Sequence, residues 1–83
     1  MYYVYVLKSE KSGQWYTGST GDLRKRLSQH NLKESNWTKR GVPWQIIYYE
    51  ASLDEVDARE REKYLKTGNG KRYLKARLKR FLT

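Results

Sequence analysis

The chain of 83 residues is short enough for one hydrophobic core, so we expect a single domain over residues 1–83. It contains no cysteine and no apolar run of about 18 residues, which excludes disulfides, Cys-rich zinc sites and a membrane span and favours a cytoplasmic protein. Its 18 Lys and Arg against 9 Asp and Glu give a net charge of +9, which favours nucleic acid as the partner over a charge that serves only solubility.

The first twenty residues predict a β-hairpin. Residues 2–7 and 14–19 are rich in aromatic and β-branched side chains, which favour strands. Gly13 lies between them and supplies a turn residue.

A short helix is expected next. Thr20 or Asp22 can cap it, and we expect it to end near Asn31. The positions that share its apolar face are Leu23, Leu27 and His30. Residues 32–43 have no periodicity and predict a loop, which Trp37 could order.

The second half of the chain predicts a strand and two helices. Residues 44–51 predict the strand, and the Ser-x-x-Glu capping box at 52–55 starts a helix that we expect over 53–66. The glycines of 67–70 suit a break before a basic amphipathic helix. Its apolar stripe is Leu74, Leu78, Phe81 and Leu82, and its basic row is Lys71, Lys75 and Lys79. The order β-β-α-β-α-α predicts an α+β fold with a small three-stranded antiparallel sheet.

Alternation along the first strand separates two sets of side chains. One face carries Tyr3, Tyr5 and Leu7, and the other carries Tyr2, Val4 and Val6. If Tyr16 of the hairpin partner shares the phenol face, two phenolic oxygens come together as donors for a phosphate and, when one ionises, as a base for water. Ordinary half-buried sheet tyrosines are the alternative, and the commoner outcome on residue type alone.

Arg26 and His30 lie one turn apart on the first helix. Arg26 falls at the edge of the buried stripe, where packing would orient its guanidinium for a bidentate grip on phosphate. The alternatives are a solvated cation beside Arg24 and Lys25, and a structural role for His30.

The second helix carries several carboxylates, most of which suit surface ion pairs. Glu62 lies four residues after Ala58 and three before Leu65, the expected buried positions, whereas Glu60 projects away from both. Glu55 lies one heptad before Glu62, so helical position does not exclude it. Glu62 is therefore the acid best placed at a cleft.

A single carboxylate at a phosphate site suits Mg²⁺ or Mn²⁺, because Mg²⁺ keeps several waters and binds one or two acids plus the substrate phosphate. No HExxH, Cys/His cluster, Walker loop, GxGxxG or nucleophile elbow is present. The sequence thus excludes zinc, nucleotide-cofactor and serine-hydrolase sites. We expect nucleic-acid contacts from Arg24, Lys25, Lys71, Lys75 and Lys79.

Several spaced elements together resemble the GIY-YIG endonucleases, in particular small stand-alone proteins similar to the N-terminal nuclease domain of an excinuclease. The matching elements are "YVY" at 3–5, "YTG" at 16–18, Arg26, His30 and "REKYLK" at 61–66. The resemblance covers essentially the whole chain. Tyr3 stands where the family has glycine, and Thr17 where it has an aliphatic residue.

The resemblance implies metal-dependent hydrolysis of a nucleic-acid phosphodiester, with DNA as the expected substrate and weak sequence preference. Glu62 would hold the one metal ion, and Arg26 would clamp a non-bridging oxygen. Tyr16 or His30 would take a proton from the attacking water, and Tyr5 would orient water or phosphate. Gly18 would keep the strand end open for a close backbone approach.

Two other readings remain open. A non-catalytic DNA- or RNA-binding protein could retain the same fold and basic surface. A membrane-surface protein could use the helix in residues 71–82, but its apolar stripe is more simply the lid of a small core.

Overall fold

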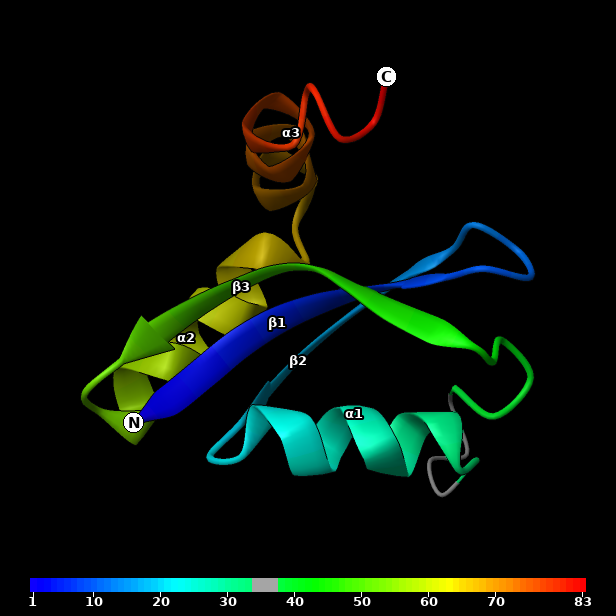
Figure 1. Cartoon of the computed structure of the whole chain (residues 1–83). Helices are drawn as coiled ribbons and strands as arrows, with labels where there is room; N and C mark the ends of the chain where they lie inside the picture. The colour runs from blue at the N-terminus through cyan, green and yellow to red at the C-terminus, as the bar shows by residue number, and fades with distance from the viewer. Residues whose placement is uncertain (34–37) are drawn as a thin grey trace.

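A three-stranded antiparallel sheet with helices on both faces forms the protein in the computed structural model, which describes residues 1–33 and 38–83 (Figure 1). The elements are β1 Tyr2–Ser9, β2 Trp15–Thr20, α1 Leu23–Asn31, β3 Trp44–Ser52, α2 Glu55–Leu65 and α3 Gly68–Arg77. This is the expected α+β fold with the order β-β-α-β-α-α. Trp37, expected to order a loop, lies outside the described residues.

β1 is the central strand of the sheet, whose order is β2-β1-β3. Tyr5 of β1 lies opposite Gly18 of β2 on one side and Tyr49 of β3 on the other. Directly opposite residues share a face of the sheet, so this register decides which β2 side chains meet the phenols.

The two faces of the sheet carry separate cores, as the alternation along β1 predicts. Beneath α2 and α3 the buried side chains are Val4, Val6, Ala58, Leu65 and Leu74. On the α1 face they are Tyr5, Leu7 and Trp44, with Tyr16, Leu23 and Leu27 packed against them. Helix α1 therefore covers the phenol face, and the helix that holds Glu62 lies across the sheet from it (Figure 1).

The starts of α1 and α2 show where side-chain capping decides a boundary. Asp22 caps α1 by accepting a hydrogen bond from the Lys25 amide. For α2 the predicted capping box is wrong: Ser52 remains in β3, paired with Tyr2, so it is not available as a cap. Asp54 caps instead, and α2 begins at Glu55 rather than at 53.

Helix α3 begins earlier and ends sooner than the glycines and the apolar stripe predict. Thr67 caps it, and Gly70 lies in its first turn, where a Cβ would overlap the Tyr64 carbonyl oxygen of α2. Glycine there lets the two helices pack closely. The stripe covers the core through Leu74, whereas Phe81 lies beyond the helix and is 49% exposed, so the expected lid is shorter.

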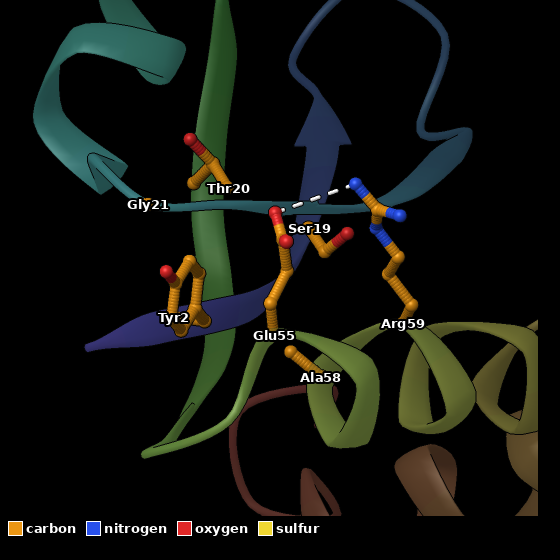
Figure 2. Close-up of a pocket in the computed structure, with 7 residues that line it drawn as sticks. All are labelled: Tyr2, Ser19, Thr20, Gly21, Glu55, Ala58 and Arg59. Atoms are coloured by element: carbon orange, nitrogen blue, oxygen red, sulfur yellow. Dashed lines mark hydrogen bonds and ion pairs between the residues drawn. The ribbon is translucent and has the colours of Figure 1, made fainter.

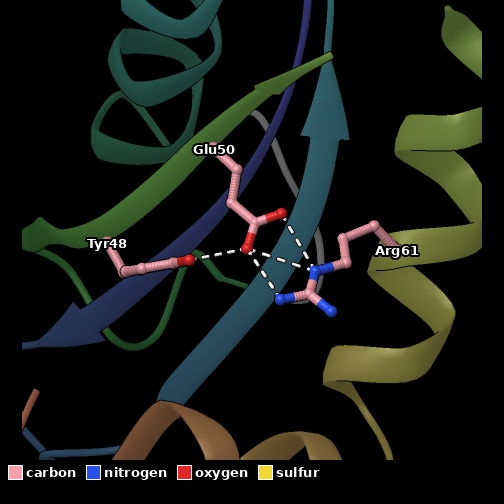
Figure 3. A network of polar contacts seen from close by, with 3 residues as sticks. All are labelled: Tyr48, Glu50 and Arg61. Carbon is pink, nitrogen blue, oxygen red and sulfur yellow. Dashed lines mark hydrogen bonds and ion pairs between the residues drawn. The ribbon is translucent and has the colours of Figure 1, made fainter. Parts of the chain in front are cut away.

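A polar network ties α2 to β3 (Figure 3). The guanidinium of Arg61 donates to both oxygens of Glu50, with Nε 2.9 Å from Oε1, and the Tyr48 hydroxyl donates to Oε2 at 2.6 Å. Arg61 also stacks near the rings of Tyr64 and Tyr73, at 5.2 and 4.8 Å. The residue next to Glu62 is thus held against the sheet.

No helix in the described part of the chain has the length and apolar character needed to cross a membrane.

Candidate active site

Two phenols meet on the α1 face of the sheet. Tyr5 is buried, with 1% of its surface exposed, and Tyr16 is half-buried, with its ring centroid 6.4 Å from that of Tyr5. Gly18, opposite Tyr5, is buried, and a Cβ there would lie 2.6 Å from the Tyr5 hydroxyl oxygen. The expectation that Gly18 leaves the strand end open is wrong: its missing side chain makes room for the Tyr5 ring.

His30 connects Tyr5 to the loop after α1. Its Nε2 lies 3.0 Å from the Tyr5 hydroxyl and its Nδ1 lies 2.7 Å from Thr38 Oγ1. The imidazole is 0% exposed. Burial, and then the charge of Arg26, lower the pKa of His30, which keeps the ring neutral. A neutral imidazole has one donor and one acceptor nitrogen, so His30 fixes the Tyr5 hydroxyl and is itself fixed by Thr38.

Arg26 is half-buried on α1, at the edge of the apolar stripe as predicted, and its guanidinium faces the two phenols. Its Nη1 donates to Gln29 Oε1 at 3.2 Å. Burial raises the pKa of Tyr5, Arg26 opposes that rise, and the nearby Tyr16 and Glu62 add to it, so the net shift is upward. Tyr5 therefore stays protonated at neutral pH and acts as a hydrogen-bond donor.

Glu62 reaches β2 from the other side of the sheet. Its Oε1 accepts from Ser19 Oγ at 2.6 Å, and its Oε2 accepts from Lys66 Nζ at 2.6 Å. Burial would raise the pKa of Glu62, but the bonds from Lys66 and Ser19 and the charges of Lys66 and Arg59 outweigh it and lower the pKa. The carboxylate is ionised at neutral pH. Because Ser19 follows Gly18 in the edge strand, the acid and the phenols lie around one strand.

The other carboxylates of α2 are arranged differently. Glu60 points into solvent and lies 3.9 Å from Lys63, as its helical position predicts. Glu55, which helical position left open, lies 3.3 Å from Arg59. Figure 2 shows this pair rising from α2 toward Ser19. The hollow that the pair lines has a volume of about 80 Å³. Helical position left both Glu55 and Glu62 as candidates, and of these two it is Glu62 that accepts a hydrogen bond from β2.

The predicted nucleic-acid contacts fall into three places. Arg24 lines a hollow between α1 and the sheet with Tyr3 and Tyr49, and Lys25 lines another with Arg26. The remaining three are on or after the last helix: Lys71 and Lys75 are exposed on α3, and Lys79 is exposed beyond its end.

Three residues that the sequence analysis did not single out complete the site. Ser19 and Thr38 contact Glu62 and His30 only because distant segments pair, so no local pattern marks them. Lys66 lies four residues after Glu62, and the i, i+4 rule for helix ion pairs could have found it.

The donor set around Glu62 fits a magnesium-like ion and not zinc. Within the described residues there is no group of three or more His, Cys, Asp or Glu side chains that could hold a metal. One ionised carboxylate suffices for Mg²⁺ or Mn²⁺, which take the rest of their ligands from water and substrate phosphate.

Comparisons with known proteins identify the family of the chain. The family model of the GIY-YIG catalytic domain matches residues 1–76. The UPF0213 protein SSP2268 of Staphylococcus saprophyticus is 35% identical over 75 residues, which cover 89% of this chain and 90% of the relative. The UPF0213 protein CPE1444 of Clostridium perfringens is 37% identical over a region that covers 80% of this chain and 71% of the relative. The UPF0213 protein YazA of Bacillus subtilis is 36% identical over a region that covers 78% of this chain and 66% of the relative.

No solved structure matches the chain. The names of the relatives assign no substrate or reaction, so the chemistry has to be argued from the residues. The family match over nearly the whole chain and the relatives of similar length lead to one conclusion: the chain belongs to the GIY-YIG family, a nuclease family, together with the small UPF0213 proteins.

Proposed function

We propose that this single-domain protein is a metal-dependent endonuclease that hydrolyses phosphodiester bonds of DNA with weak sequence preference. One observation carries the proposal: Ser19 ties the ionised carboxylate of Glu62 to the edge strand β2, whose other face carries Tyr16 beside Tyr5 of β1 and Arg26 of α1. An acid for a cation, a guanidinium for a phosphate and a phenol for water are thereby gathered around β2.

The burial of each side chain indicates which step of the reaction it would perform. Arg26 binds a non-bridging phosphate oxygen, because its half-buried guanidinium is oriented before substrate arrives. Tyr16, the more exposed phenol, acts as the base in its ionised form: the phenolate oxygen takes the proton from the attacking water and becomes a neutral phenol. Tyr5 stays protonated and orients water or phosphate by donating its one hydroxyl proton, which requires the tautomer in which His30 Nε2–H donates to the Tyr5 oxygen. Buried His30 thus positions Tyr5 rather than meeting water itself.

Glu62 is the residue that would hold Mg²⁺ or Mn²⁺. When bound there, the ion supplies charge stabilisation on the phosphate and on the leaving 3′ oxygen. Ser19 holds one carboxylate oxygen in place, and the other oxygen accepts from Lys66, whose side chain is 52% exposed and would give up this bond to the ion.

Cleavage assays with purified protein test the proposal. Labelled single-stranded, duplex and branched DNA and RNA are incubated with Mg²⁺, Mn²⁺ or EDTA. Wild type is expected to cut DNA only with a divalent ion. Glu62→Gln is expected to lose at least about 100-fold in rate while retaining binding, because the amide no longer attracts a cation. Glu60→Gln removes a charge from the outer face of α2 and serves as the matched control.

Two results would contradict the proposal. Unchanged cutting by Glu62→Gln would show that the metal site lies elsewhere. Wild type that binds these substrates and cuts none would favour a nucleic-acid-binding protein that retains the fold.

A further inference from the structure

A groove leads from the candidate active site toward the β1–β2 turn. Its first hollow, of about 250 Å³, lies between Tyr16 and Lys66 at one end and Trp15 and Lys71 at the other. A second hollow, of about 510 Å³, continues from Trp15 and Lys71 to Lys75. Because the two hollows share Trp15 and Lys71, they form one surface, here called the Trp15 groove.

The Trp15 groove is positively charged. Lys66, Lys71 and Lys75 line it, and none of the described residues that line it is a carboxylate. Lys71 and Lys75 form no ion pair with the described part of the chain, in contrast to Lys63 on α2, which lies beside Glu60. The charge of the groove is therefore available to an anionic ligand.

Trp15 gives this groove an aromatic surface between its lysines. The side chain packs against the buried cluster beneath α2 and α3, yet stays half-buried and contributes to both hollows. An aromatic side chain flanked by cations is the arrangement on which unpaired bases stack while their phosphates bind the cations. The bases of a duplex have their faces covered by neighbours and cannot stack in this way.

We infer that the Trp15 groove binds a single unpaired nucleic-acid strand, with one base stacked on Trp15 and the adjoining phosphates at Lys71 and Lys75. The same strand would continue past Lys66 to Tyr16, where, on the proposed function, the scissile phosphate lies. Unpaired strand next to the cut is thus the substrate feature that this surface recognises.

Fluorescence anisotropy with labelled oligo(dT) and a duplex of equal length, both in EDTA, measures binding without cleavage. Trp15→Leu is expected to weaken single-strand binding by about tenfold or more and duplex binding by less than about twofold. Trp15→Phe keeps an aromatic face and is expected to restore most of the affinity. Thermal unfolding of both variants, followed by circular dichroism, shows that they are folded.

Lysine variants test the phosphate contacts independently of Trp15. Lys75→Ala is expected to lower the slope of log K against log salt by about 0.7 on single strands. Lys63→Ala removes the same charge from a residue that lines neither hollow and is expected to leave the slope unchanged.

The outcomes separate this inference from the proposed function. Trp15→Leu that is folded and binds oligo(dT) as tightly as wild type would overturn the groove, as would equal losses on single strand and duplex. Trp15-dependent binding by a protein that cuts nothing would keep the groove and overturn the nuclease. Metal-dependent cutting by a protein whose single-strand binding does not depend on Trp15 would keep the proposed nuclease function and overturn the groove.

Discussion

Ser19 Oγ donates a hydrogen bond of 2.6 Å to Glu62 Oε1, although the two residues are 43 positions apart in the chain. This contact fixes the carboxylate relative to β2, the strand that carries Tyr16. Ser19→Ala leaves Lys66 as the partner of Glu62, so we expect about a tenfold loss in metal affinity or cleavage rate, as for other groups that orient a metal ligand.

Cleavage rates titrated with Mn²⁺ measure the effect of Ser19→Ala. Ser28→Ala, a change on α1 away from Glu62, is the matched control and should titrate as wild type. A Ser19→Ala protein with a wild-type metal titration would show that the hydrogen bond does not position the carboxylate.

Removing the hydroxyl of Tyr5 should mainly lower stability, and removing that of Tyr16 should mainly lower the cleavage rate. Tyr5→Phe leaves His30 Nε2 without its buried partner, which we expect to cost about 1–3 kcal/mol of unfolding free energy. Tyr16→Phe removes the hydroxyl of a half-buried ring, so stability should change little while cleavage falls by about 100-fold or more. Urea unfolding and single-turnover cleavage measure the two effects, and a Tyr16→Phe protein that cuts at the wild-type rate would remove Tyr16 as the base.

Gly18 should tolerate no side chain. Its Cβ would lie 2.6 Å from the Tyr5 hydroxyl and 2.8 Å from Cζ, in a buried position where the ring cannot move away. We expect Gly18→Ala to destabilise the protein by about 1–3 kcal/mol, the usual cost of overpacking. Gly68→Ala is the control, because nothing lies within 4 Å of its Cβ position. Equal stability of the two variants would contradict the packing described for Tyr5.

Local sequence patterns predicted most of the fold. The alternation along β1 assigned Tyr5 to one face and Val4 to the other, and the order of strands and helices followed from residue propensity, periodicity, and turn and capping residues. The cap of α2 was predicted at the wrong residue because pairing with Tyr2 keeps Ser52 in β3, and a cap prediction that reads only neighbours has no access to that pairing.

The candidate site was less predictable, since its contacts join segments that are distant in sequence. The choice of Glu62 over Glu60 came from helix geometry and agrees with the exposure of the two side chains. The partners Ser19 and Thr38 depend on sheet register and on the loop after α1, which no short window of sequence contains.

The Glu50–Arg61 pair should stabilise the contact between β3 and α2. Burial alone would raise the pKa of Glu50, but the hydrogen bonds from Arg61 and Tyr48 lower it overall. Because the pKa of Glu50 is lower in the folded protein than its ordinary value of 4.5, the ionised carboxylate stabilises the fold above pH 4.5. This stability is lost as the pH falls through the pKa of the folded protein. Glu50→Gln should therefore cost about 1–2 kcal/mol at pH 7 and less at about pH 3.

Urea unfolding at both pH values measures the Glu50→Gln effect. Glu60→Gln, whose carboxylate is exposed on the same helix that holds Arg61, is the control and should differ little from wild type. A cost for Glu50→Gln that is the same in acid as at neutral pH would mean that the charge of Glu50 does not contribute.

Acid should weaken the protein through His30. Burial, and then Arg26, lower the pKa of this imidazole from its ordinary 6.5, so the unfolded chain binds the proton more readily than the folded one. Stability is then fully present above pH 6.5 and falls as pH drops toward the folded value, by at most about 1.4 kcal/mol per pH unit.

The chain has one histidine, so His30→Gln isolates this effect. The variant loses the bonds to Tyr5 and Thr38 and should be less stable than wild type at about pH 7.5. Because glutamine does not titrate, the difference between the two proteins should shrink as pH falls from about 7.5 to about 5.5. Unfolding free energies from urea titrations across that range measure it, and parallel pH profiles would show that His30 binds its proton equally well folded and unfolded.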